Sequence, residues 1–228
     1  MNIVEKIDQN VKVRHILVSV SDKTGLEDII PELVRINPSV RFFSTGGTYK
    51  KLKEILDNET KGNTPQSLLT QVSDYTGQPE TQGGLVKTLD FKIYLGLLTE
   101  TYNPSHQNDL KRTLSVPIDM VIVNLYPFEA TIKKDGVTPE AARGNIDIGG
   151  PTMIRAAAKN FIRVAPVVNP SDYEAVIKDL KDNSGMTTLE MRFKLAQKAF
   201  EHTAKYDRAI SDYLAGLSFD EVGGCYGK

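Results

Sequence analysis

The chain has 228 residues, of which 40% are hydrophobic and 25% charged, and its formal net charge is −1. This length fits one large α/β domain, or one domain with a helical extension, and allows a proper core. The near-neutral charge argues against a broad nucleic-acid surface, so any anion site must be local. The single cysteine, Cys225, excludes an internal disulfide. The three histidines are widely spaced, which argues against a His-based zinc motif.

The N-terminal residues lack the apolar core of a signal peptide. No run of about 18 apolar residues occurs anywhere in the sequence. We therefore expect no membrane span, and together with the cysteine content this favours a cytoplasmic location.

The first part of the chain alternates between strand and helix patterns. Residues 13–20 form a run rich in β-branched residues, and residues 26–36 follow with helical periodicity. Residues 40–43 repeat the strand pattern and lead through Ser44–Thr48 into a second helix, to about residue 56. This alternation predicts a parallel sheet with helices packed on its faces.

The rest of the chain continues the pattern less regularly. Thr138 is a predicted N-cap with Pro139 at the first helical position. The remaining expected elements are strands at 68–72, 92–98, 118–124 and 163–168, a long loop at 73–87, a short helix within 101–113, and helices at 151–160, 169–182 and 188–214. We expect one domain at 12–214, with 1–11 and 215–228 as terminal tails.

Ligands of an open parallel sheet bind beyond the carboxyl ends of its strands. Four polar clusters fall there in this sequence: Ser19–Gly25, Ser44–Thr48, Asn124–Phe128 and Asn145–Gly150. Ser44–Thr48 combines hydroxyls and glycines at a helix start, which suits phosphate, although an ordinary N-cap would look the same. Neither GxxxxGK[ST] nor GxGxxG is present, so neither a P-loop nor a Rossmann cofactor site is indicated.

The stretch Asn145–Asn160, NIDIGGPTMIRAAAKN, places the carboxylate of Asp147 just before a helix and the amine of Lys159 further along it. On spacing alone, an ordinary loop-to-helix junction is the simpler explanation. Lys87 and Tyr126 are two further candidates. A lone loop lysine is usually solvated, and such a tyrosine more often covers the edge of a core.

Seven stretches together resemble one family. They are SVSDKTG (19–25), STGGT (44–48), VSDYTGQPE (72–80), GGLVKTL (83–89), VNLYPF (123–128), NIDIGGPTMIRAAAKN (145–160) and KAFEHTAKYDRAISDYL (198–214). In order, they resemble the inosine monophosphate cyclohydrolase domain of the bifunctional purine biosynthesis protein. The resemblance implies a methylglyoxal-synthase-like fold, with a three-layer, mostly parallel sheet covered by helices on both faces and a C-terminal helical extension.

The resemblance also implies the reaction, in which 5-formamidoimidazole-4-carboxamide ribonucleotide loses water and closes to inosine monophosphate. The attacking carboxamide must lose a proton, which suits Asp147, and the formyl oxygen gains charge, which suits Lys87 with Lys159 and Tyr126. Substrate-binding residues implied in the same way are Ser21, Lys23, Ser44, Thr45, Gly46 and Gly47 for the phosphate, Asn124 and Gly149 for the base or ribose, and Thr88. No cofactor or metal is implied. The expected partners are the nucleotide substrate and product, a second copy in a homodimer and a separate formyltransferase, with no nucleic acid or membrane.

The sequence departs from the family at Leu85, Asp90, Phe91 and Tyr94, all close to Lys87. A carboxylate at Asp90 is expected to pair with Lys87 and make it a poorer acid. Two alternatives therefore remain open. One is a nucleotide sensor of the same fold that has lost turnover, and the other is a methylglyoxal-synthase-like lyase acting on a triose phosphate. The LYPF and IDIGG stretches and the long C-terminal helix argue against the lyase.

Overall fold

The structure is a computed structural model that describes residues 3–62, 64–65, 67–78 and 87–226. Its centre is a five-stranded parallel sheet with the strand order β4-β3-β2-β5-β6. The strands of this sheet are β2 (His15–Ser19), β3 (Arg41–Ser44), β4 (Leu69–Gln71), β5 (Met120–Val123) and β6 (Ala165–Val167). The fold predicted from the alternating pattern is confirmed.

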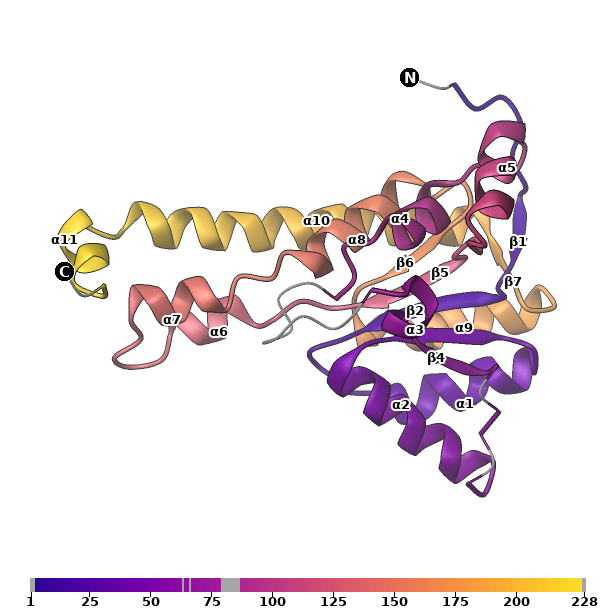
Figure 1. The fold of residues 1–228 in the computed structure, drawn as a ribbon, viewed down its shortest axis with the longest axis horizontal. Helices are drawn as coiled ribbons and strands as arrows, with labels where there is room; N and C mark the ends of the chain where they lie inside the picture. The colour runs from indigo at the N-terminus through magenta and orange to yellow at the C-terminus, as the bar shows by residue number, and fades with distance from the viewer. Residues whose placement is uncertain (1–2, 63, 66, 79–86, 227–228) are drawn as a thin grey trace.

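Helices cover both faces of this sheet (Figure 1). One face packs on α1 (Leu26–Ile36), α2 (Gly46–Glu59) and α9 (Tyr173–Asp182). The other face packs on α4 (Phe91–Leu98), α8 (Gly149–Lys159) and α10 (Leu189–Ala215). The sheet and its two helical coverings form the predicted three layers.

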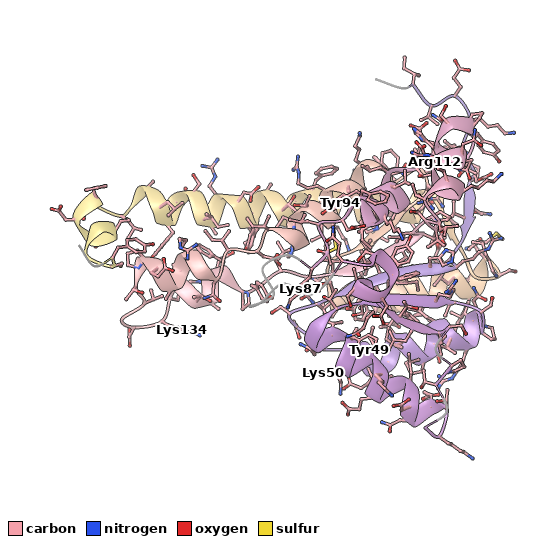
Figure 2. All side chains as sticks on the ribbon, in the orientation of Figure 1. Tyr49, Lys50, Lys87, Tyr94, Arg112 and Lys134 are labelled. Carbon is pink, nitrogen blue, oxygen red and sulfur yellow. The ribbon has the colours of Figure 1, made fainter. Side chains whose placement is uncertain are left out.

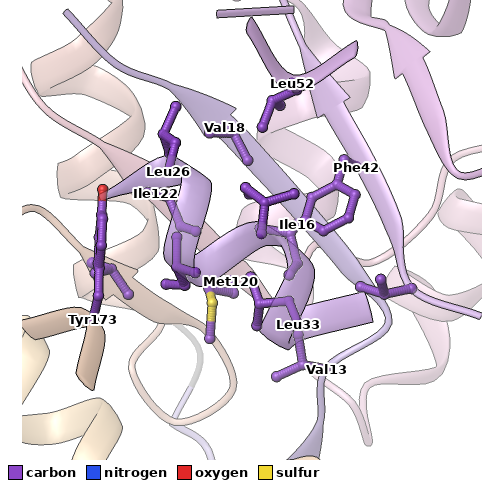
Figure 3. Close-up of a cluster of buried hydrophobic side chains, with 14 of the residues drawn as sticks. Val13, Ile16, Val18, Leu26, Leu33, Phe42, Leu52, Met120, Ile122 and Tyr173 are labelled. Atoms are coloured by element: carbon purple, nitrogen blue, oxygen red, sulfur yellow. The ribbon is translucent and has the colours of Figure 1, made fainter. Parts of the chain in front are cut away.

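Alternation along the strands supplies both cores. In β5, Met120 and Ile122 belong to the core under α1, whereas Val121 and Val123 belong to the core under α8 and α10. Successive strand residues point to opposite faces, so a strand covered on both sides is apolar throughout. Figure 3 shows the α1-side core, where strand residues such as Ile16 and Ile122 meet Leu26 and Tyr173.

The remaining helices are short: α3 (Val72–Thr76), α5 (Pro104–Arg112), α6 (Phe128–Ile132), α7 (Pro139–Gly144) and α11 (Phe219–Gly223). A 3-10 turn at Pro170–Asp172 precedes α9. The long helix α10 runs beyond the sheet, and α6, α7 and α11 lie beside its outer end (Figure 1). The predicted C-terminal helical extension is thereby confirmed.

Residues 92–98 are helical, so the predicted strand there is wrong. The run FKIYLGLL is apolar almost throughout, and a short run of that kind does not distinguish a buried strand from a buried helix. The Asp90 side chain accepts the Lys92 N–H at 2.8 Å and caps the helix. At Gly96 an added Cβ would lie 2.6 Å from the Val116 carbonyl oxygen, so this helix packs closely on the chain before β5.

Four further elements differ from the sequence expectations. Residues 72–76 are helical within the predicted loop. In the N-terminal lead, β1 (Asn10–Lys12) pairs antiparallel with β7 (Met186–Thr188). In the C-terminal tail, α11 begins with a capping box between Ser218 and Glu221. These elements are only three to five residues long, too short to show periodicity.

Candidate active site

A cavity of about 380 Å³ opens beyond the carboxyl ends of β2, β3 and β5. After β2 the chain adds β3 and β4 on one side, then crosses to place β5 on the other side of β2. Ligands of open α/β sheets bind at such a switch in strand order. The cavity is lined by Ser19, Val20, Ser21, Thr45, Gly46, Gly47, Lys87, Thr88, Leu89, Asn124, Tyr126, Gly144, Ile146, Asp147, Ile148, Gly149, Gly150 and Met153.

The start of α2 forms one wall. Gly46 has φ +51°, a left-handed conformation that favours glycine, and the backbone N–H groups of the first helical turn have no partner within the helix. A Cβ at Gly46 would lie 3.5 Å from the Lys87 Nζ, so the ammonium sits directly against this turn. Figure 2 shows Lys87 near the middle of the molecule. Helix dipole and ammonium together favour a bound anion here.

Two residues expected in the phosphate site do not line the cavity. The Ser44 side chain is fully buried, and its hydroxyl donates to the Val18 carbonyl at 2.8 Å on the neighbouring strand. Lys23 extends back along its own turn, with its Nζ 3.3 Å from the Ser21 carbonyl oxygen. Ser44 therefore joins two strands, and Lys23 acts on the cavity only through its charge.

Asn124 lines the cavity, but its amide is already used. Its Oδ1 accepts the N–H groups of Ser21 and Asp22 at 2.7 and 3.0 Å, and its Nδ2 donates to the Asp22 carbonyl at 2.8 Å. The side chain thus fixes the turn that follows β2. We had expected contact with the base or ribose, and the structure instead favours a role in shaping the wall.

Asp147 sits at the start of α8. Its Oδ1 accepts the Gly150 N–H at 3.0 Å, and a Cβ at Gly150 would lie 2.6 Å from its Oδ2. Only glycine lets the carboxylate fold back onto the helix start. Burial raises the pKa of Asp147, against the opposing effect of backbone N–H groups from Gly150, Tyr126 and Gly149. A raised pKa makes the carboxylate a stronger base than an exposed one.

Tyr126 and Thr88 complete the polar lining. Tyr126 is 51% exposed and follows β5 into the cavity. Thr88 is buried, and its Oγ1 would lie 2.9 Å from a Cβ at Gly149, so the close contact between these segments requires glycine there. The structure therefore brings Lys87, Thr88, Tyr126 and Asp147 to one cavity.

Lys159 does not join them. It is the last residue of α8, ten residues after Gly149. At 1.5 Å per residue this is about 15 Å along the helix axis from the end that lines the cavity. We expected one helix to hold Asp147 and Lys159 at the same site. Within this chain it does not, because Asp147 lies just before the start of α8 and Lys159 is its last residue.

The four departures near Lys87 fall in different places. Leu85 lies outside the described residues. The buried Asp90 carboxylate caps α4 and makes no ion pair with Lys87, so the expected pairing between these two described residues is wrong. Phe91 and Tyr94 belong to α4 and do not line the cavity.

Part of the cavity lining is apolar, and the sequence analysis does not predict it. Ile146, Ile148 and Met153 border the cavity, and Ile148 is 63% exposed. The alternation of apolar and polar residues in NIDIGG was the available signal, because Ile146 and Ile148 flank Asp147. An apolar wall beside polar groups suits a planar base attached to a sugar phosphate.

Within the described ranges, no three His, Cys, Asp or Glu side chains gather in a way that could hold a metal ion. No helix in the same part of the chain is both long and apolar enough to cross a membrane.

Two family models match the chain. The MGS-like domain model matches residues 25–152, and the AICARFT/IMPCHase bienzyme model matches residues 157–224. Together they cover most of the cavity lining and the long C-terminal helix.

Individual relatives agree. The bifunctional purine biosynthesis protein PurH of Chlorobium phaeobacteroides is 48% identical over 208 residues, or 91% of this chain and 38% of that protein. The same protein of Trichormus variabilis is 44% identical, over 91% of this chain and 39% of that protein. The chain thus spans about two fifths of the length of these relatives.

The solved structure titled "Crystal structure of ForH" superimposes with a TM-score of 0.74 at 30% identity, covering 89% of this chain and 97% of that one. The chain therefore belongs to the MGS-like domain family. Its C-terminal part also matches the AICARFT/IMPCHase bienzyme model.

Proposed function

We propose that the chain is an inosine monophosphate cyclohydrolase, which closes 5-formamidoimidazole-4-carboxamide ribonucleotide to inosine monophosphate with loss of water. The observation that carries the proposal is the cavity itself. It combines a helix start suited to phosphate, the Lys87 ammonium, the Tyr126 phenol and the Asp147 carboxylate. The relatives that match over 91% of the chain support the same reaction.

The chemistry assigns each group a step. Asp147 takes a proton from the carboxamide nitrogen, which then attacks the formyl carbon. The formyl oxygen becomes negatively charged, and Lys87 stabilises it with help from the Tyr126 hydroxyl. The oxyanion takes up one proton to become a hydroxyl and a second to leave as water, while the formamido nitrogen gives up its only proton and forms the C=N bond of the new ring. The two protons gained by the oxygen equal the two lost by the nitrogens. Because both reacting groups belong to one substrate, the cavity lowers the barrier further by holding them in contact.

The substrate phosphate binds at Thr45, Gly46 and Gly47. These residues line the cavity at the first turn of α2, whose backbone N–H groups have no partner within the helix, and the Lys87 Nζ lies beside Gly46. Ser21 lies on the facing turn, which Asn124 holds in place. Thr88 and Gly149 lie where the base would contact the α8 side of the cavity.

The decisive experiment compares Asp147→Asn with the wild type in an absorbance assay on the formamido nucleotide. Turnover should fall by about 10²–10⁴-fold, because a general base is lost. Binding of inosine monophosphate, measured by calorimetry, should change little. Asp22→Asn is the matched control, since Asp22 lies on the same rim but its carboxylate is bonded to Thr24.

Uncatalysed cyclisation must be subtracted, because ring closure proceeds slowly without enzyme. Unchanged turnover in Asp147→Asn would remove the role given to Asp147. Tight binding by the wild type without turnover above background would instead identify a nucleotide sensor.

The cyclohydrolase needs a source of its substrate. A formyltransferase supplies it. That enzyme is either a separate protein or a further segment of the same polypeptide, since the chain matches only about two fifths of the length of each relative. We also place the reaction in the cytoplasm, because the Cys225 thiol is free and suits a reducing compartment.

The assembly proposed is a homodimer in which Lys159 serves the cavity of the second copy. Lys159 shares an exposed helix face with Arg155, four residues earlier, whose guanidinium lies 5.5 Å from the Phe200 ring centroid. Phe193 and Phe200 are 46% and 39% exposed on α10, and they are seven residues apart, about two turns, and so share one face of that helix. Such a face suits an interface between protein chains.

Mixing two inactive variants tests this arrangement. Asp147→Asn and Lys159→Ala should each lack turnover as pure dimers. If Lys159 acts on the other copy, a mixed dimer has one cavity with both residues intact, and activity returns on mixing. If mixing restores nothing while mass spectrometry shows mixed dimers, Lys159 does not act across the interface.

A further inference from the structure

A tyrosine from the C-terminal helix contacts the backbone of the proposed base. The Asp147 N–H donates to the Tyr206 hydroxyl oxygen at 2.7 Å, across 59 residues of sequence. Tyr206 lies on α10 and is 9% exposed. Because the bond is partly buried, its loss would leave a partly shielded N–H without this partner.

The Tyr206 ring is itself held in place. It packs edge-on against Phe128, with ring centroids 6.3 Å apart and an interplanar angle of 70°. Phe128 follows Tyr126 by two residues, and its N–H donates to the Tyr126 carbonyl at 2.8 Å. The same tyrosine therefore supports two of the cavity segments that carry proposed catalytic groups, those of Asp147 and Tyr126.

We infer that Tyr206 is a positioning residue, which holds the Asp147 backbone so that the carboxylate stays against the Gly150 N–H and faces the substrate. The inference deepens the proposed cyclohydrolase function and rests on it. Asp147 lies in the part matched by the MGS-like domain model, whereas Tyr206 lies in the part matched by the bienzyme model. The C-terminal helix thus contributes directly to the geometry of the cavity.

Loss of the hydroxyl has a chemical consequence beyond stability. Backbone N–H groups of Gly150, Tyr126 and Gly149 lower the pKa of Asp147 and partly offset its burial. When the Asp147 backbone relaxes, these bonds lengthen and the pKa of Asp147 should rise further. The ionisable groups that act on Tyr206 are Asp147, Asp207 and Tyr126, so the carboxylate is its main charged neighbour in the cavity.

The test uses Tyr206→Phe, which keeps the ring and removes only the hydroxyl. Tyr213→Phe is the matched control. Tyr213 lies on the same helix and packs on the same Phe128 ring at 5.8 Å, but its hydroxyl makes no hydrogen bond to any other described residue. Both variants are compared with the wild type for kcat, for KM and for the Asp147 carboxyl titration by ¹³C NMR. The Asp147→Asn variant assigns the Asp147 signal.

In Tyr206→Phe, kcat should fall by about 10- to 100-fold with KM within about threefold, because a misplaced group costs the chemical step more than binding. The Asp147 titration should move to higher pH. Tyr213→Phe should change neither quantity. Phe128→Leu gives a second route, because it keeps the hydroxyl but loosens the ring, and it should move both quantities in the same direction by less.

The outcomes separate the two claims. If the wild type turns over and Tyr206→Phe shifts neither kcat nor the titration, the positioning role is overturned. A fall in thermal stability with an unmoved Asp147 titration would also overturn it, since that marks a purely structural contact. If the titration moves but the wild type shows no turnover, Tyr206 positions Asp147 and the cyclohydrolase proposal fails.

Discussion

The two ends of β5 differ in how the nearby polar side chains are bonded. At its amino end, the Asp119 Oδ2 accepts the N–H groups of Arg14 and His15 at 2.9 and 3.0 Å, and its Oδ1 accepts from Arg163 at 2.9 Å. Arg163 also donates to the carbonyls of Gly96, Thr99 and Ile118. Both side chains are buried, and each charge has its partners.

At the carboxyl end of the same strand, polar side chains line the cavity. Tyr126 is half exposed, the Lys87 ammonium faces the first turn of α2, and burial raises the pKa of Asp147. The amino end thus stabilises the sheet, whereas the carboxyl end presents a phenol, an ammonium and a carboxylate to a cavity. Perturbed carboxylates in a cavity mark functional sites more often than fully bonded ones do.

The largest expected effect lies at the amino end. Asp119→Ala should lower the free energy of unfolding by about 3–5 kcal/mol, because it leaves the buried Arg163 guanidinium without its countercharge. Urea denaturation measures the loss. At a temperature where the variant stays folded, KM should be unchanged. A loss below about 1 kcal/mol would show that the carbonyl partners alone satisfy Arg163.

The next largest effect is a loss of turnover at the carboxyl end, with little change in stability. Lys87→Met should lower turnover by about 100-fold, because it removes a cation from beside the developing oxyanion. The free energy of unfolding should stay within about 0.5 kcal/mol, as for most exposed positions. Lys50→Met is the control, since Lys50 is an exposed lysine of α2 that does not line the cavity (Figure 2). Equal turnover in the two variants would contradict the role of Lys87.

A smaller effect is expected at the rim. Lys23→Ala should weaken inosine monophosphate binding by up to about fivefold, because a partly exposed charge outside the cavity lining contributes about 1 kcal/mol or less. The phosphate-free nucleoside should bind both proteins equally, and the difference should shrink at high salt. Calorimetry at two salt concentrations checks this. Equal weakening for nucleotide and nucleoside would remove Lys23 from the phosphate site.

The smallest effect concerns stability and pH at Asp147. Its pKa is raised in the folded protein, so the folded state holds this proton more tightly than the unfolded state does. The free energy of unfolding therefore falls as the pH rises from the pKa of Asp147 in the unfolded state to its pKa in the folded state. Above both pKa values it stays at the lower level. Melting temperatures should show Asp147→Asn gaining stability relative to the wild type between pH 4 and pH 7.5. A constant difference across this range would mean that the pKa is not raised.

Much of the fold could be predicted because its signals are local. The helix at 26–36 was predicted with the bounds observed, since its apolar residues repeat at helical spacing and Asn37-Pro38 follows them. The strand at 92–98 was predicted wrongly, because a short run that is apolar almost throughout shows no clear period. The β1–β7 pair was missed, because its two strands lie about 175 residues apart and each has only three residues.

The candidate site divides in the same way. Thr45, Gly46, Gly47 and Asp147 were predicted from strand ends followed by helix starts, and they line the cavity. Residue type does not specify side-chain direction, so Ser44 was expected in the site although it faces the neighbouring strand. Lys159 was expected beside Asp147, although the length of one helix separates them.

The sequence by itself determined most of the order of helices and strands along the chain, the two-sided burial of the sheet and the positions where polar turns follow strands. These properties depend on local composition and periodicity, which a single chain displays directly. Only the tertiary structure decided which polar groups are already bonded, such as Asn124, and which distant residue supports the proposed base, Tyr206. The physical reason is that a hydrogen bond between residues 59 positions apart depends on how helices pack, and packing leaves no local pattern in the sequence.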